Sequence, residues 1–164
     1  MTNRVSASRI VAGSADEVFK VITDISRLPE WNRAITAVIE RPEHLYEGAQ
    51  WTVEICALGR TWHSRSTVET LDPIGRCFAY RSAPDDGNPS FALWTWVVAP
   101  HHDGTLVTVA SELHPLTFVR RVLLVHIRAW QLKHSELLQS LAALETAAHP
   151  ALGAVPATNP GGSQ

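Results

Sequence analysis

The chain has 164 residues, a length that fits one domain and is too short for two well-packed ones. Apolar residues make up 45% of the sequence and charged residues 18%, an ordinary globular composition that argues against a disordered chain. The formal net charge is −2, with acids and bases interleaved and no basic stripe, so we expect no nucleic-acid partner.

The cysteine and hydropathy patterns exclude several further classes. Cys56 and Cys77 stand alone, without a CxxC unit, and are predicted to be small buried or half-buried apolar residues. No charged region followed by a continuous apolar stretch opens the sequence, so we expect no signal peptide. The most apolar run, residues 118–127, is far shorter than the ~20 residues that cross a bilayer. We therefore expect a cytoplasmic protein without stable membrane insertion.

The first elements are a strand and two short helices. Alternating β-branched residues predict a strand over 5–11. Ser14 and Glu17 then match a capping box, which predicts a helix start. A second short helix is expected from Asp24 to Leu28 and should end at Pro29, because the residue before a proline disfavours the α region.

From Ile35 onward, apolar residues recur with period two between regular turns, which predicts six further strands. Leu58 and Gly59 read as a two-residue hairpin turn, which places Ile55 opposite Trp62 and Glu54 opposite His63. No helical pattern interrupts the strands, so the sheet should be antiparallel. The strands are expected at residues 35–40, 50–57, 60–71, 76–82, 90–99 and 105–113, with loops at 72–75, 84–89 and 100–104.

One long helical pattern follows the strands, from about Leu116 to about Ala147. At 1.5 Å per residue it would be a rod of roughly 45 Å, which has to lie along the sheet. In its second half, Leu137, Leu141 and Leu144 form a core stripe. The sequence after His149 consists mainly of Pro, Gly, Ala, Ser and Asn. We therefore expect one domain over residues 1–148 and a disordered tail over 149–164.

Several segments resemble the START-like, or SRPBCC, superfamily and its polyketide cyclase/dehydrase-like members. They are Ala15–Phe19, Asp24–Asn32, Leu71–Pro73, Gly104–Thr105 and the final helix. The resemblance covers about residues 3–147. It implies an α+β helix-grip fold, in which a seven-stranded curved antiparallel sheet wraps around a long C-terminal helix. Two short helices follow the first strand in this fold. It also implies a cavity between sheet and helix that takes lipids, steroids or polyketides.

Aromatic residues are the main candidates for contact with such a ligand, because they combine a large apolar surface with one polar handle. Core packing is the alternative for each of them. In the long helix, His126 stands within an apolar stripe and needs a hydrogen-bond partner, which a ligand or a strand could supply. The predicted ligand-binding residues are Trp31, Trp62, Tyr80, Trp94, Trp96, Val122, His126 and Trp130.

Acid–base chemistry has three candidates, Glu54, His63 and Glu112. They form either part of the solvent face or a convergent set inside the cavity. If the tryptophans face inward, Glu54 and His63 are an exposed cross-strand pair. His101 and His102, beside Asp103, are interpreted as solvated histidines, and we expect neither a metal nor a cofactor.

Two functions are consistent with these patterns. The favoured one is binding of a hydrophobic small molecule by a monomer or homodimer. The alternative is a polyketide cyclase, aromatase or dehydratase, which would hold a flexible chain folded while acids and bases move protons. A regulatory module that binds another protein through residues 118–127 is a third hypothesis. No nucleophile elbow, phosphate loop or HExxH motif is present.

Overall fold

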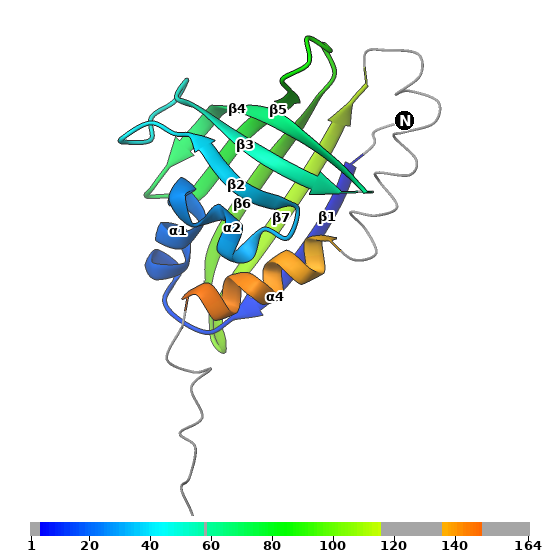
Figure 1. Cartoon of the computed structure of the whole chain (residues 1–164). Coiled ribbons are helices and arrows are strands. Elements are labelled where there is room, and N and C mark those ends of the chain that lie inside the picture. Colours follow the sequence, from blue (N-terminus) through cyan, green and yellow to red (C-terminus); the bar gives the residue numbers. More distant parts are fainter. Residues whose placement is uncertain (1–3, 58, 116–135, 149–164) are drawn as a thin grey trace, which may run out of the picture.

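The computed structural model describes residues 4–57, 59–115 and 136–148. A curved sheet forms most of this part, and helices lie against one side of it (Figure 1). In chain order the elements are β1 (Arg4–Val11), α1 (Ala15–Thr23), the 3₁₀ helix η1 (Ile25–Arg27), α2 (Leu28–Trp31), β2 (Ile35–Glu40), β3 (Gln50–Ala57), β4 (Arg60–Asp72), β5 (Cys77–Pro84), β6 (Phe91–His101), β7 (Gly104–His114) and α4 (Leu137–Ala148).

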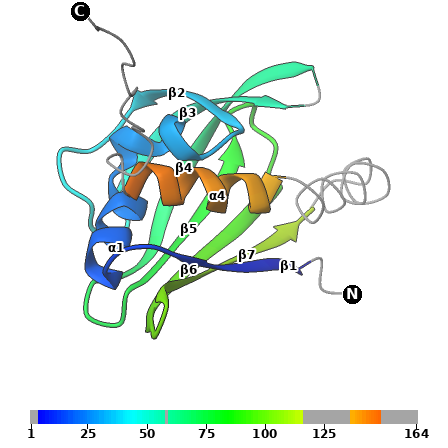
Figure 2. The ribbon, with the colours of Figure 1, turned by 90° about the horizontal axis from the view of Figure 1, so that it is seen from below.

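The seven strands form one antiparallel sheet in the order β1-β7-β6-β5-β4-β3-β2. Strands β2 to β7 are a meander of hairpins, while β1 crosses to pair with β7. Helix α4 lies across the same side of the sheet as α1 and α2 (Figure 2). The expected helix-grip architecture is confirmed.

The predicted register of the β3–β4 hairpin is confirmed. Ala57 pairs with Arg60, and Ile55 lies opposite Trp62. Since side chains alternate between the two faces of a strand, this register decides which residues face the helices. Trp51 and Val53 are buried on that face, which we call the inner face. Cys56 falls on the outer face and is exposed, so the expectation that it is buried or half-buried is wrong.

The prediction that Pro29 ends the second helix is wrong. Helix α2 begins at Leu28 and continues through Pro29 to Trp31. A proline fits the first turn of a helix because its missing N–H has no intrahelical partner there. Asp24 instead caps the N-terminus of the preceding η1, where its carboxylate accepts from the Ser26 N–H at 3.1 Å.

The hairpin between β6 and β7 is tighter than expected. The sequence predicts a loop over residues 100–104, but β6 runs to His101 and β7 starts at Gly104, which pair with each other. Only His102 and Asp103 remain in the turn. Gly104 has a φ of +139°, a conformation open to glycine, and this lets the ladder continue to the tip.

Helix α4 packs with one leucine stripe against the core. Leu137, Leu141 and Leu144 form this stripe and are buried as predicted, whereas Leu138, about a quarter-turn from the stripe, is 50% exposed. The expected helical residues 116–135 and the expected tail from 149 lie outside the described residues. No helix in the described ranges is long and apolar enough to cross a membrane.

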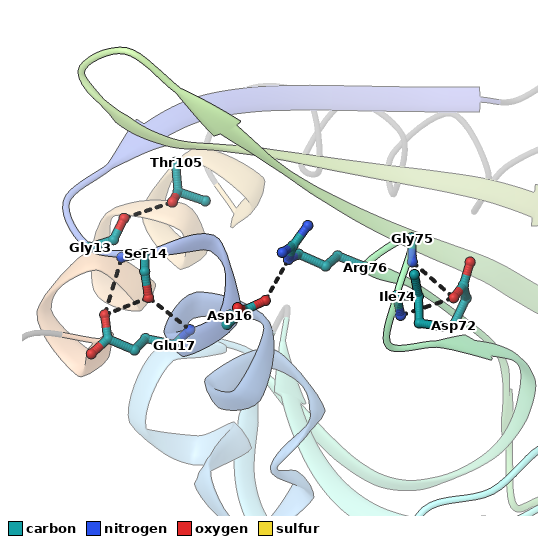
Figure 3. Close-up of polar contacts among 9 residues, drawn as sticks. All are labelled: Gly13, Ser14, Asp16, Glu17, Asp72, Ile74, Gly75, Arg76 and Thr105. Atoms are coloured by element: carbon teal, nitrogen blue, oxygen red, sulfur yellow. Dashed lines mark hydrogen bonds and ion pairs between the residues drawn. The ribbon is translucent and has the colours of Figure 1, made fainter.

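Polar contacts tie the start of α1 to two distant turns (Figure 3). The predicted capping box is present, with the Glu17 N–H donating to Ser14 Oγ and the Ser14 N–H donating to Glu17 Oε2. Asp16 forms an ion pair with Arg76 at 2.7 Å, next to the β4–β5 turn. The Thr105 hydroxyl donates to the Gly13 carbonyl at 2.7 Å, which joins β7 to the same segment.

The packing of α4 against the core can be tested by truncating one leucine side chain. Leu141→Ala should lower the free energy of unfolding by about 2–5 kcal/mol, because it removes a fully buried side chain and leaves a cavity. Leu138→Ala, on the exposed side of the same helix, is the matched control and should change it by less than about 0.5 kcal/mol. Urea denaturation measures both, and equal losses would show that the stripe is misassigned.

Candidate ligand-binding face

Aromatic rings cover the inner face of the central strands. The Trp51 ring lies 5.0 Å from Tyr80 and 6.1 Å from Phe78, measured between ring centroids. Tyr80 in turn stacks against Trp94 at 6.4 Å. The cluster therefore runs continuously from β3 through β5 to β6.

A second aromatic contact joins the sheet to α2. Trp31 meets Trp96 edge to face, with ring centroids 5.2 Å apart. Both side chains are almost completely buried, at 1% and 2% exposure. In the described structure these two predicted ligand contacts are packed core residues.

The inner face becomes more accessible toward the other predicted contacts. Trp51, Tyr80 and Trp96 are buried, whereas Trp62 and Trp94 are half-buried. Trp62 faces inward from β4 because it pairs with Ile55, and Trp94 faces inward because it pairs with Tyr80. Accessible aromatic surface is thus found at one end of the face.

Four serine hydroxyls share the inner face with these tryptophans. Ser64 Oγ lies 2.7 Å from Ser82 Oγ and donates to the Ala83 carbonyl at 3.1 Å. Ser66 pairs with Ser82 across β4 and β5, and Ser111 pairs with Trp94 across β7 and β6. Ser111 is fully buried, and its Oγ has no hydrogen-bond partner among the described residues. A buried hydroxyl costs free energy unless a partner satisfies it.

Tyr80 places a neutral phenol in this face. Burial raises the pKa of Tyr80 well above its usual range, because the charged phenolate would lose its hydration. The nearby Trp96 indole lowers this pKa and the Glu136 carboxylate, just before α4, raises it, both by less than burial does. At neutral pH the Tyr80 hydroxyl is therefore a donor and not a base.

The three acid–base candidates lie on the outer face. Glu54 pairs with His63, as the hairpin register predicts, and Glu54 Oε1 accepts from the Thr36 hydroxyl at 2.6 Å. Glu112 forms an ion pair with Arg4 at 3.4 Å. Strands β4, β5 and β6 separate Glu54 from Glu112, roughly 20 Å at the usual strand spacing. The structure does not bring these three residues together, and their catalytic role stays a prediction.

Sequence reasoning missed the inner-face serines. The signal was present for Ser64 and Ser66, because they stand two and four residues from Trp62 and must share its face. The other predicted contacts, Val122, His126 and Trp130, lie outside the described residues.

A separate groove of about 580 Å³ lies between α1, the β2–β3 loop and the end of β4. Its floor is apolar, with Phe19, Ile25 and Leu71, while its rim carries both acids and bases. Lys20 and Arg41 stand there beside Asp24, so the groove has no single sign of charge to select a ligand.

A comparison with family models assigns this arrangement to a known group. The model described as polyketide cyclase/dehydrase and lipid transport matches residues 2–145. The chain belongs to this family. A search of curated proteins finds no match.

Solved structures with the same fold include two aromatase/cyclases and a plant latex-like protein. The ZhuI aromatase/cyclase from Streptomyces sp. R1128 is 20% identical, with a TM-score of 0.68 over 94% of this chain and all of that one. The di-domain aromatase/cyclase StfQ of the steffimycin pathway is 13% identical, with a TM-score of 0.71 over 94% of this chain and 53% of that one. Major latex-like protein 151 from Panax ginseng is 11% identical, with a TM-score of 0.67 over 92% and 99%. At these identities the likeness establishes the fold alone.

The buried phenol predicts a pH dependence that can be measured. The folded pKa of Tyr80 lies above the unfolded value of about 10, so the unfolded chain loses this proton first as the pH rises. Below pH ~10 Tyr80 makes its full contribution to the free energy of unfolding. Above that pH the contribution falls by up to about 1.4 kcal/mol per pH unit.

Tyr80→Phe should remove this contribution to the slope, seen in urea denaturation between about pH 9 and 11. Tyr46→Phe, at an exposed side chain, controls for the loss of a phenol. Identical slopes for wild type and Tyr80→Phe would contradict the burial of the hydroxyl.

Proposed function

We propose that this protein binds a hydrophobic small molecule on the inner face of the sheet, at the end that carries Trp62 and Trp94. The observation that carries the proposal is the position of these two half-buried rings beside a row of serine hydroxyls. A pocket of apolar walls with a few polar groups is what a small-molecule site usually presents.

The composition of the face favours a flat, oxygen-bearing ligand. Aromatic rings stack best on rings, while the Ser111 hydroxyl, which has no hydrogen-bond partner among the described residues, can donate to an isolated ligand oxygen. A saturated acyl chain would leave the Ser111 hydroxyl without a partner. A steroid or a polyketide-like molecule fits these groups better. Val122, His126 and Trp130 remain proposed contacts from the long helix.

A polyketide cyclase or dehydratase is the second candidate, and the family description favours it. ZhuI and StfQ, which share the fold, are named aromatase/cyclases. Such an enzyme works largely by holding a flexible chain in a reactive conformation. Here Tyr80 would act as a neutral hydrogen-bond donor, since the acid–base candidates Glu54, His63 and Glu112 lie on the other face.

The site can be tested with one substitution on each face of β6. Trp94→Ala should weaken the binding of a hydroxylated anthraquinone by about tenfold or more, which corresponds to ~1.4 kcal/mol. Val97→Ala, on the exposed outer face of the same strand, is the matched control and should leave the affinity unchanged. Isothermal titration calorimetry measures both without depending on tryptophan fluorescence. Equal affinity of Trp94→Ala and wild type would place the ligand elsewhere.

Turnover separates the two candidate functions. If the protein only binds its ligand, incubation with a poly-β-keto substrate should give no product by mass spectrometry. Glu54→Gln, His63→Ala and Glu112→Gln should then change affinity only modestly. Product formation that falls by ~10²–10⁴ in any of these variants would instead establish an acid–base enzyme.

A further inference from the structure

Three groups that can bind a metal ion meet at the tip of the β6–β7 hairpin. One ligating atom from each of His101, His102 and Asp103 lies within 4.8 Å of the other two. His102 Nε2 is 2.8 Å from Asp103 Oδ2, and the two imidazole rings are 4.0 Å apart between centroids. Two imidazoles and one carboxylate therefore face a common point.

This meeting is a product of the fold and not of sequence adjacency alone. Consecutive residues of a strand point to opposite faces, which would separate His101 from His102. The strand ends at His101, however, and the chain turns at His102 and Asp103. The turn brings the second ring back over the first.

The turn is held in place by contacts at its base. A Cβ at Gly104 would lie 2.5 Å from the Val11 carbonyl oxygen, so the backbones of β7 and β1 approach closely there. The next residue, Thr105, is fully buried and donates to the Gly13 carbonyl (Figure 3). The three side chains thus extend from a base that is fixed to the segment before α1.

We propose that this turn binds a late first-row divalent cation, and that Zn²⁺ is the ion it binds in the cell. Imidazole nitrogen and carboxylate oxygen are ligands that Zn²⁺ accepts, at distances of about 2.0–2.2 Å. A tetrahedral ion with such bonds separates its ligand atoms by about 3.4 Å. His102 and Asp103 are exposed and His101 is half-buried, so rotations of the side chains can reach this spacing. A water molecule would complete the coordination.

Two contacts have to be replaced when the ion binds, and the first is the 2.8 Å ion pair between His102 Nε2 and Asp103 Oδ2. The Asp103 N–H donates to His101 Nδ1 at 3.2 Å, near the long end of the usual range. The second is the hydrogen bond at His101 Nδ1, because a metal bound there takes the same lone pair and leaves the N–H of the exposed Asp103 to be hydrated. The exchange gives up one weak hydrogen bond and one exposed ion pair, and it gains coordinate bonds from all three residues.

A plain ion pair between His102 and Asp103 is the competing interpretation, and His101 distinguishes the two. An ion pair needs only two residues, whereas the metal site needs the third. The described chain contains natural controls, since His44 lies 4.0 Å from Glu43 and His114 lies 3.9 Å from Glu112 without a second imidazole in the group. These pairs should not bind Zn²⁺ measurably.

The proposed metal site is independent of the proposed ligand site. Ser111 lies seven positions after Gly104 along β7, about 24 Å at the usual rise of a strand. A negative result for zinc binding therefore does not contradict the proposed ligand site, and a negative result for ligand binding does not contradict the metal site.

The experiment is a titration of the full-length chain, without an affinity tag and after treatment with EDTA, with ZnCl₂ alone. Calorimetry should show one Zn²⁺ per chain with a Kd below about 100 μM. His101→Ala, His102→Ala and Asp103→Asn should each weaken binding by about tenfold or more. His44→Ala is the matched control and should bind as wild type does.

A melting curve with and without ZnCl₂ gives the second readout. Zinc should raise the Tm of the wild type, because it binds the folded chain, and should not raise that of His101→Ala. Absence of binding in the wild type would overturn the proposal. Wild-type affinity in His101→Ala would overturn it as well, since the pair of His102 and Asp103 would then suffice.

Discussion

The cross-strand register of the sheet is the constraint on which the other features depend. Side chains alternate along each strand, so a slip of one residue would move every inward ring to the solvent. The pairing of Ile55 with Trp62 fixes β4 relative to β3, and the pairing of Tyr80 with Trp94 fixes β6 relative to β5. Aromatic contacts and register stabilise each other, because the rings meet only in this alignment.

The register could be read from the sequence because its determinants are local. A two-residue turn with Gly59 leaves one alignment for the β3–β4 hairpin, and the Ser14–Glu17 capping box needs only neighbouring residues. The helix end predicted at Pro29 was wrong because proline is acceptable in a first helical turn, and the sequence does not say where that turn begins. Where tertiary contacts decide an element boundary, local signals cannot fix it.

The candidate site was predictable only in part for a similar reason. A strand pattern predicts that Trp94 and Trp96 share a face, and both do face inward. It does not predict that Trp96 is covered by Trp31 while Trp94 stays half-buried, because that depends on which strands the helices reach. The serines were missed because serine is mostly an exposed residue, and the partner that allows it to face inward, as Ser64 and Ser82 do for each other, comes from another strand.

Strand β7 connects the two proposed sites, which raises the question of whether they influence each other. Coupling over such a distance needs an element with two discrete arrangements that both sites favour differently. The described contacts hold β7 at its start, where Thr105 donates to Gly13, and hold α1 through the ion pair of Asp16 with Arg76. A sheet paired on both edges of β7 leaves no second register for it to adopt. Sites this far apart without shared partners usually contribute independently. The described part of the fold therefore supports two separate sites on one rigid frame.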